Sequence, residues 1–253
     1  MAHQWQSNNP NPDKECYFDR NGKGNLEKFI DVYAENYAKT KNDGYIAIPT
    51  ANHDFQRPNV GSRNTPEQLK VTMTFSLTMP GVPFIYYGDE IGMKYQMNLP
   101  SKEGSRERAG TRTPMQWTNG ANAGFSTVSD ASKLYFPVDT ENGKLTVETQ
   151  EADKASMLNY VRTLLKLRAE NPALGNDADW QLLNVKGGQV YPMVYVRSAA
   201  GQKVMVVLNP TAKKQTMAVE GEAKKVLSTT GKANFKKGKV TLDAFSTLIV
   251  ELQ

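Results

Sequence analysis

The feature that most constrains the fold of this chain is an alternating α/β pattern that contains only two strands. Two short apolar runs, 45–50 and 82–87, predict buried strands, and they alternate with helices predicted at about 25–40, 65–79 and 153–170. Alternating helices and buried strands imply a parallel sheet. A parallel sheet of two strands cannot bury itself, because both of its outer edges stay open. These elements therefore indicate the end of a larger α/β assembly.

The second predicted helix has clear start and stop signals. Thr65 can cap it, Pro66 fits its first turn and Gln68 completes a capping box. Pro80 ends it, because the residue before a proline avoids the helical conformation. Its apolar residues fall on more than one face, so we expect this helix to be buried.

The pattern changes near residue 180 to short β-rich runs separated by turn signals. The runs cover residues 180–185, 190–197, 203–209, 214–219, 224–228, 239–242 and 245–251. Seven short strands at close spacing suggest an antiparallel β-sandwich. We therefore predict an α/β part over residues 1–175 and a β-sandwich domain over 176–253. The long polar stretch 92–150 is interpreted as a loop, and a loop of this length is usually either functional or a sign that elements within it have been missed.

Composition and charge argue against several classes of protein. The net charge of +5 resides entirely in residues 201–253, which hold nine lysines, four acidic residues and no arginine. Scattered lysines indicate a solvated surface, and nucleic acid is not an expected partner. No apolar run approaches the roughly 20 residues that span a membrane. The single cysteine, Cys16, excludes an intramolecular disulfide and a cysteine-based zinc site. The localisation stays open.

Three motifs follow the predicted strands in order. The first is Asn52-His53-Asp54, at the carboxyl end of the first strand, which is the end that carries the active site in (β/α)8 barrels. Alone, this tripeptide fits a simple turn as well as a site that positions sugar hydroxyls. The second motif spans residues 80–93 around the second strand. The third is Arg-Thr-Pro-Met-Gln-Trp at 112–117.

Together these motifs resemble the α-amylase family of glycoside hydrolases (family 13), in particular its α-glucosidase and oligo-1,6-glucosidase branch. The resemblance covers about residues 25–253. It implies that 45–50 and 82–87 are strands seven and eight of a (β/α)8 TIM barrel, and that 153–170 is the last barrel helix. The predicted sandwich then corresponds to the domain that follows the barrel in this family. The expected fold is α/β plus all-β: the C-terminal part of a barrel, then an antiparallel β-sandwich.

The resemblance also implies roles for individual residues. Asp54 matches the third catalytic carboxylate, which stabilises the transition state, and His53 matches a residue that binds the same sugar. Arg112 matches an arginine that recognises the non-reducing terminal glucose, and Arg57 matches an arginine near the site, which we also expect to bind substrate. The adjacent acids at 89–90 are interpreted as structural support rather than as a reacting pair. No metal or cofactor is expected.

Two catalytic groups of the family have no counterpart here. Retaining glycosidases need a nucleophilic carboxylate and an acid/base carboxylate about 5–5.5 Å apart, and the motifs that carry them are absent from this sequence. We therefore expect the C-terminal portion of a retaining α-glucoside hydrolase acting on α-linked gluco-oligosaccharides, inactive as an isolated chain. Its expected partners are that substrate and either the missing N-terminal part of the barrel or a second copy.

An alternative interpretation is a non-catalytic carbohydrate-binding or interaction protein derived from the same family. The presence of Asp54, His53 and Arg112 favours the enzyme, because a protein that only binds sugar has no need of a transition-state stabiliser. The motifs do not separate hydrolases from isomerases. The three tryptophans, Trp5, Trp117 and Trp180, are interpreted as packing residues rather than as platforms for sugar rings.

Overall fold

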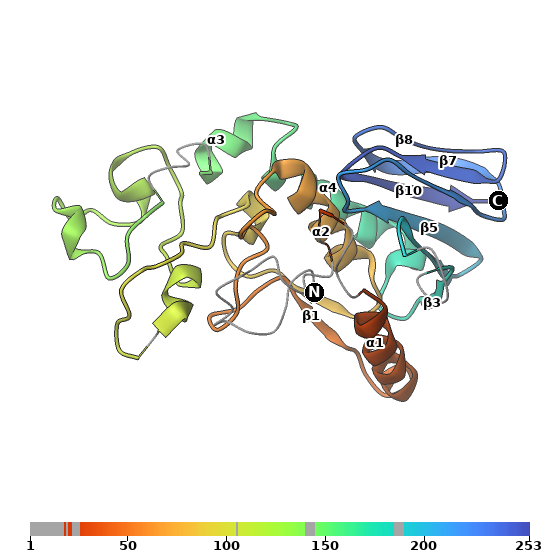
Figure 1. The fold of residues 1–253 in the computed structure, drawn as a ribbon, viewed down its shortest axis with the longest axis horizontal. Helices are drawn as coiled ribbons and strands as arrows, with labels where there is room; N and C mark the ends of the chain where they lie inside the picture. The colour runs from red at the N-terminus through yellow and green to blue at the C-terminus, as the bar shows by residue number, and fades with distance from the viewer. Residues whose placement is uncertain (1–17, 19, 22–25, 105, 140–144, 185–189) are drawn as a thin grey trace.

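The computed structural model describes residues 18, 20–21, 26–104, 106–139, 145–184 and 190–253, and Cys16 lies outside them (Figure 1). The α/β part contains four helices and two strands among these residues. They are α1 (Leu26–Thr40), β1 (Ala47–Pro49), α2 (Pro66–Thr78), β2 (Val82–Phe84), α3 (Val147–Ala152) and α4 (Met157–Glu170). The β-rich part contains eight strands within its described ranges. They are β3 (Asp179–Leu182), β4 (Met193–Ala199), β5 (Gln202–Asn209), β6 (Gln215–Ala218), β7 (Ala223–Thr230), β8 (Ala233–Lys236), β9 (Lys239–Leu242) and β10 (Ser246–Leu252).

The two predicted strands pair as a parallel two-stranded sheet, in register from Ala47 opposite Val82 to Pro49 opposite Phe84. Gly81 permits this pairing. It adopts φ +113°, and a Cβ at this position would lie 2.3 Å from the carbonyl oxygen of Ile46. Only glycine tolerates both that dihedral and that approach. Within the described residues no further strand pairs with either edge of this sheet.

The β-rich part is an antiparallel sandwich, as predicted. One sheet has the order β3-β4-β5-β10-β7 and the other has the order β6-β9-β8. The sequence predicted seven strands and missed β8, whose residues Ala-Asn-Phe-Lys carry no β-branched side chain. The predicted boundary at 175/176 falls between the end of α4 and the start of β3.

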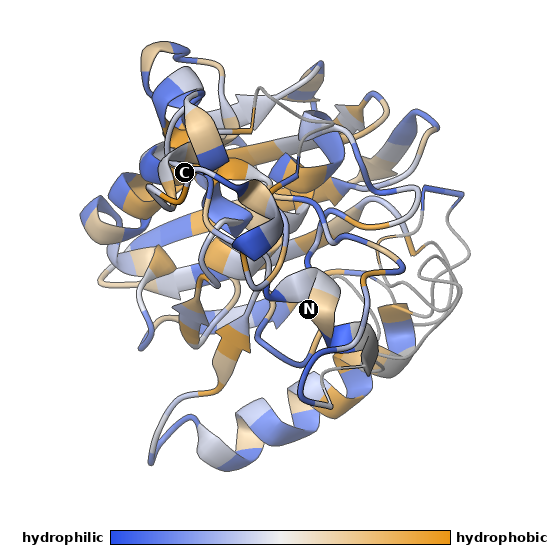
Figure 2. Cartoon of the chain, turned by 90° about the vertical axis from the view of Figure 1, so that its left-hand side faces the viewer, coloured by the Kyte–Doolittle hydropathy of each residue, from blue (hydrophilic) through white to orange (hydrophobic). Residues whose placement is uncertain are grey.

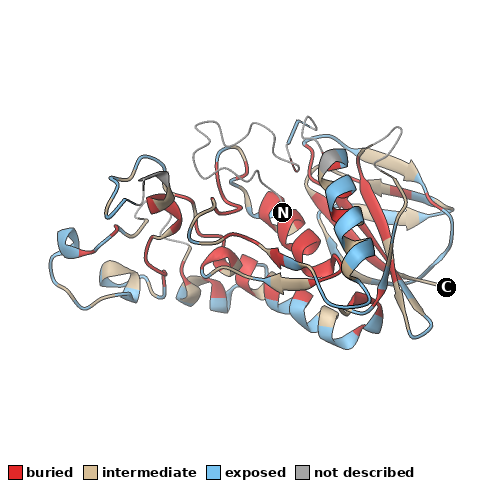
Figure 3. Ribbon diagram, turned by 90° about the horizontal axis from the view of Figure 1, so that it is seen from below, coloured by how far each residue is buried: buried red, intermediate tan, exposed pale blue. Residues whose placement is uncertain are grey.

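The five-stranded sheet is covered on both faces. Alternate residues of β5 separate into two clusters: Val204, Val206 and Leu208 join the helices, while Met205 and Val207 face the smaller sheet. Because successive side chains of a strand point to opposite faces, a strand buried on both sides must be apolar throughout. The central strands therefore form the middle layer of the molecule, with helices on one side and the smaller sheet on the other (Figure 3).

The helices cover the open side of that sheet. α2 is buried along almost its whole length and contacts α4, β5 and β10. The sequence predicted that α2 would be buried. Part of its cover is the sandwich of the same chain, through β5 and β10. α1 carries hydrophobic and hydrophilic residues around its circumference (Figure 2), and Leu26, Ile30 and Tyr33 turn inward to the same core.

The segment between β2 and α4 extends away from the sandwich (Figure 1). Its residues 92–150 were predicted as a long loop, and the described part of the segment contains four short 3₁₀ turns and α3. The turns are η1 (Asp89–Ile91), η2 (Arg106–Thr111), η3 (Ala121–Gly124) and η4 (Ala131–Lys133). No helix in the described ranges is long and apolar enough to cross a bilayer.

Candidate functional site

The site lies where the two parallel strands end. The amide of Thr50, the residue after β1, donates to the carbonyl of Phe84 at the end of β2 at 2.9 Å. The Thr50 hydroxyl donates to Asp89 Oδ2 at 2.6 Å and accepts from the Tyr86 amide at 3.0 Å. These contacts bring the segment after β1 and the segment after β2 together at one edge. Parallel pairing therefore places the first two motifs side by side.

A tight turn fixes the backbone of Asp54. The side-chain oxygen of Asn52 accepts from the amides of Asp54 at 2.8 Å and Phe55 at 2.9 Å. Asparagine commonly forms such turns, because its carbonyl can replace a backbone acceptor. The turn directs residues 53–54 outward from the strand end, where they remain partly exposed.

The Asp54 carboxylate is surrounded by cationic groups. Its Oδ1 accepts from Arg108 Nη1 at 2.8 Å and from Arg112 Nη2 at 3.1 Å. His53 Nε2 lies 3.3 Å from Oδ2. The hydrogen bond from Arg108 is the main cause that lowers the pKa of Asp54, and the charges of His53, Arg108 and Arg112 act in the same direction. Asp54 is therefore ionised at neutral pH, with 39% of its side chain exposed.

Arg112 links the first and third motifs. Its Nε donates to the backbone carbonyl of His53 at 2.8 Å while its Nη2 contacts Asp54. The Arg112 guanidinium therefore fixes the orientation of the 53–54 turn and also lies beside the Asp54 carboxylate. The structure brings Asp54, His53 and Arg112 together, as the motifs predicted.

Arg57 occupies a different environment. Its guanidinium is fully buried, 2.9 Å from Asp89 Oδ1, and donates to the carbonyls of Tyr87 at 2.6 Å and Thr111 at 3.1 Å. The rings of Tyr86 and Tyr87 lie 4.9 Å from its Cζ. A side chain with no exposed surface cannot contact a sugar. The prediction that Arg57 binds substrate therefore does not fit its position, and we interpret Arg57 as a residue that ties the strand-end loops together.

The two neighbouring acids are not free to react. Burial raises the pKa of Asp89 to about 6, and the charge of Arg57 and the hydroxyl of Thr50 oppose that rise. Burial likewise raises the pKa of Glu90. Asp89 is fully buried and its two oxygens contact Arg57 and Thr50. This geometry agrees with a structural role for Asp89.

Arg108 is the contact that the sequence did not reveal. It lies in η2, four residues before Arg112, within a stretch predicted only as a loop. Its position depends on how that loop folds back over the strand ends, and no local pattern carries this information. Four-residue spacing between two arginines is a weak signal that fits a solvated surface equally well.

Trp5 lies outside the described residues, and the other two tryptophans lie in different environments. Trp180 packs edge-on against Tyr33 and Tyr37, with ring centroids 5.5 and 5.8 Å away, as expected for a packing residue. Trp117 leaves 49% of its surface exposed and lines a cavity beside Arg112. Packing against the protein therefore does not account for the exposed half of the Trp117 side chain.

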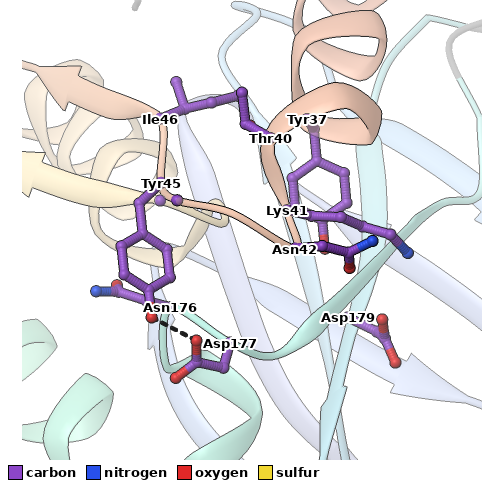
Figure 4. Close-up of a pocket in the computed structure, with 11 residues that line it drawn as sticks. Tyr37, Thr40, Lys41, Asn42, Tyr45, Ile46, Asn176, Asp177 and Asp179 are labelled. Carbon is purple, nitrogen blue, oxygen red and sulfur yellow. Dashed lines mark hydrogen bonds between the residues drawn. The ribbon is translucent and has the colours of Figure 1, made fainter.

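A second, smaller cavity lies at the opposite ends of the strands (Figure 4). Tyr45 and Ile46 precede β1 and Gly81 precedes β2, and Tyr45 Oη donates to Asp177 Oδ1 at 2.5 Å. Its volume is about 100 Å³, below the roughly 300 Å³ where ligand pockets begin.

Among the described residues no group of three histidine, cysteine or acidic side chains is placed to hold a metal ion.

Comparison with models of known protein families identifies the family of this chain. The family model described as "Alpha amylase, catalytic domain" matches residues 6–177, and a second, described as "Alpha-amylase SusG C-terminal domain", matches 193–249. The chain belongs to the α-amylase family. Its α/β part is accordingly a portion of the catalytic TIM barrel, and its sandwich is the all-β domain that follows.

Curated relatives are longer than this chain. Trehalose synthase/amylase TreS of Mycobacterium tuberculosis is 34% identical over 176 residues, which are 65% of this chain and 28% of that protein. Alpha-amylase 3 of Dictyoglomus thermophilum is 28% identical over 226 residues, 89% of this chain and 42% of that protein. Glucan 1,6-alpha-glucosidase of Streptococcus pneumoniae is 28% identical over 241 residues, 83% of this chain and 44% of that protein. The chain thus spans less than half the length of these relatives.

Solved structures show the same fold. The trehalulose synthase MutB from Pseudomonas mesoacidophila superimposes with a TM-score of 0.76 at 22% identity, over 90% of this chain and 47% of MutB. A MutB mutant in complex with sucrose gives a TM-score of 0.77. At this identity the similarity concerns the fold. It agrees with a partial barrel followed by a β-sandwich.

Proposed function

We propose that this chain is the C-terminal portion of a retaining α-glucoside hydrolase acting on α-linked gluco-oligosaccharides, and that Asp54 is its transition-state stabiliser. The observation that carries the proposal is the Asp54 carboxylate. It lies at the carboxyl ends of parallel barrel strands, is ionised and partly exposed, and is held by His53, Arg108 and Arg112. Names such as alpha-amylase and glucan 1,6-alpha-glucosidase among the relatives support this substrate class.

The geometry fits the electrostatic part of glycoside hydrolysis. The transition state resembles an oxocarbenium ion, and its positive charge is favoured by an ionised carboxylate nearby. Asp54 can also accept from sugar hydroxyls through its exposed face, while Arg112 donates to them. His53, with 68% of its side chain exposed, is free to contact the same sugar. Arg57 holds the loops that carry these groups in place through its contacts with Asp89 and the loop carbonyls.

Neither of the acids next to the site, Asp89 and Glu90, is placed to serve as one of the other two carboxylates. Asp89 is buried against Arg57, and the carboxylate of Glu90 accepts from nearby backbone amides. Neither can act as a nucleophile toward a sugar at Asp54 while it makes these contacts. We therefore propose that the isolated chain does not hydrolyse α-glucosides, and that the nucleophile and acid come from the preceding part of a barrel.

The two-stranded sheet is suited to such a partner. Each of its outer edges has no paired strand in the described part of the chain. Phe84 of β2 exposes 56% of its surface, although this strand would be enclosed in a closed barrel. Unpaired strand edges readily accept another strand. We propose the amino-terminal barrel strands as that partner, in preference to a second copy of this chain.

Hydrolysis assays test this proposal. The purified chain is expected to release no nitrophenol from p-nitrophenyl α-glucoside. Joined to the amino-terminal part of alpha-amylase 3 of Dictyoglomus thermophilum, which carries the remaining barrel strands of that relative, the same chain is expected to support hydrolysis of maltotriose. Turnover by the isolated chain that depends on Asp54 would contradict the proposal.

A further inference from the structure

A further cavity lies at the amino-terminal ends of α2 and α4. Its walls come from α2, from η1 and the residues after it, and from the connection between α3 and α4. Its volume is about 800 Å³, within the roughly 300–1,000 Å³ range of ligand pockets. None of its lining residues belongs to the Asp54 site or lines the cavity beside Arg112. It is therefore a separate feature of the molecule.

The apolar wall of this cavity is aliphatic. Leu69 of α2, Ile91 of η1 and Met157 of α4 line it, and all three side chains are buried. Gly92 lets this wall pack closely, since a Cβ there would lie 3.2 Å from Leu69 Cδ1 and 3.7 Å from Met157 Cγ. No aromatic side chain is among the described residues that line the cavity. The wall therefore suits aliphatic carbon better than a sugar ring or a nucleobase, which stack on aromatic faces.

Asn59 supplies a polar atom that the protein leaves unpaired. The residue lines the cavity and is only 6% exposed. Its Nδ2 donates to the carbonyl of Gly92 at 2.7 Å, and its own carbonyl accepts from the Tyr95 amide at 2.9 Å. The first contact fixes the orientation of the carboxamide, because only the amide nitrogen can donate to a carbonyl. The remaining atom, Oδ1, is buried and has no hydrogen-bond partner in the described structure.

The other buried polar side chains at the cavity already have partners. Gln150 Nε2 donates to the carbonyl of Ile91 at 2.7 Å, and Gln150 Oε1 accepts from the Leu158 amide at 3.0 Å. Ser156 Oγ donates to the carbonyl of Gln150 at 2.8 Å. An acceptor that is buried without a donor is costly. Asn59 Oδ1 is therefore the atom that a ligand in this cavity would satisfy.

The charges around the cavity balance. Lys94 and Asp153 are the charged side chains among its described lining residues, one of each sign. The cavity therefore has no excess charge that would select an ion.

We propose that this cavity binds a small neutral molecule with a compact aliphatic body and one hydroxyl or amide N–H donor. The body contacts Leu69, Ile91 and Met157, and the donor contacts Asn59 Oδ1. Burial of aliphatic carbon supplies most of the affinity, and the hydrogen bond fixes the orientation of the ligand.

Titration of the isotope-labelled 253-residue chain with cyclohexylmethanol, followed by NMR, tests this site. The side-chain amide signals of Asn59 are expected to shift and to reach saturation, because the ligand hydroxyl donates to that carboxamide. Methoxycyclohexane is the matched control ligand, an isomer that has the same ring and no donor. It is expected to bind about fivefold more weakly, the usual effect of one lost hydrogen bond.

A filled cavity separates binding there from adsorption elsewhere on the surface. Ala155 lines the cavity and is exposed, so Ala155→Trp can occupy the space without entering the protein core. This variant is expected to lose the Asn59 shifts. Ala152→Trp is the matched control variant, because Ala152 is also exposed, lies at the end of α3 and does not line the cavity. It should bind cyclohexylmethanol as the unaltered chain does.

Three results would overturn the proposal. The first is the absence of a saturable shift at Asn59, which would leave water as the partner of its Oδ1. The second is equal affinity for the two isomers, and the third is undiminished binding by Ala155→Trp. None of these results bears on the proposed function, which is judged by hydrolysis in the assembled barrel and depends on no residue of this cavity.

Discussion

At the scale of single residues, the site is organised by the charge around Asp54. Two guanidinium groups contact the same carboxylate oxygen, and His53 lies near the other. Such an arrangement keeps the carboxylate ionised, which is the state that can stabilise a developing positive charge. Because Arg108 makes the shorter of the two arginine contacts, we expect it to control the ionisation of Asp54 more strongly than Arg112 does.

Replacement of Arg108 tests whether this residue controls the ionisation of Asp54. Arg108→Ala should raise the pKa of Asp54 toward the ordinary aspartate value of about 3.9, because the first cause of its depression is removed. A carboxyl-carbon NMR titration of labelled protein measures the change. The depressed pKa stabilises the folded state above the unfolded pKa, and this contribution is lost as the pH falls through the folded pKa. An unchanged midpoint in the variant would show that Arg108 does not hold the carboxylate in solution.

The buried pair Arg57–Asp89 gives a stability prediction. Arg57→Met leaves the Asp89 carboxylate buried without its cation and is expected to cost about 3–5 kcal/mol in the free energy of unfolding. Urea denaturation measures the loss. The control is Arg162→Ala, which breaks the exposed ion pair with Glu151 and should cost no more than about 1 kcal/mol. Equal losses in the two variants would mean that the buried pair is not a structural tie.

Sequence reasoning located this site only in part, for physical reasons. Asp54, His53 and Arg112 were found because they belong to short motifs placed at strand ends. Arg57 was placed in the right region but assigned a sugar contact, since a motif does not reveal whether a guanidinium is buried against a carboxylate. Arg108 was missed because its contact with Asp54 joins residues 54 apart in sequence through an irregular loop.

At the scale of elements, the two ends of α2 show what local sequence determines. The start was predicted, and the capping box is present: Thr65 Oγ1 accepts from the Gln68 amide at 3.4 Å and Gln68 Oε1 accepts from the Thr65 amide at 3.2 Å. The carboxyl end was predicted too, since α2 stops at Thr78 and Met79, the residue before Pro80, is extended, but distant arginines satisfy its last carbonyls. Arg168 of α4 donates to Leu77 O at 2.8 Å, and Arg197 of β4 donates to Thr78 O at 2.6 Å. No local pattern predicts these contacts.

Arg197 also joins the two parts of the chain. It is fully buried and donates to the carbonyls of Gly175 at 2.6 Å and Ala178 at 3.2 Å in the connection between α4 and β3. Burial lowers its pKa to about 10, so it stays charged at neutral pH. Because carbonyls from α2 and from the connection converge on one side chain, the sandwich and the barrel portion are held in a defined arrangement.

The stability cost of a substitution at each end of α2 tests whether Arg197 holds the two parts of the chain together. Arg197→Met should lower the free energy of unfolding by about 2–3 kcal/mol, because several buried carbonyls lose a charged donor. Thr65→Ala should cost only about 1 kcal/mol, the usual effect of an N-cap. Thermal or urea unfolding of both variants provides the measurement. A larger loss for Thr65→Ala would contradict the assignment of Arg197 as the tie between the two parts.

At the scale of the whole molecule, the chain is well packed on one side and open on the other. The five-stranded sheet lies between the helices and the smaller sheet and buries both. The two barrel strands have no such cover along their edges in the described structure. Counting strands against the sheet that they require predicted part of a larger α/β assembly, and the family resemblance identified that assembly as a barrel. The way the sandwich covers α2 could not be predicted, because it depends on long-range packing.

The central claim is that this chain supplies Asp54 to an active site completed by other barrel strands. The most direct measurement is maltotriose hydrolysis by the fusion with alpha-amylase 3, compared with the same fusion carrying Asp54→Asn. The substitution keeps shape but removes charge, so kcat should fall by about 10²–10³ or more, as when a preorganised stabilising group is removed, with little change in the unfolding midpoint. A fusion that hydrolyses maltotriose equally well with asparagine at this position would contradict the account.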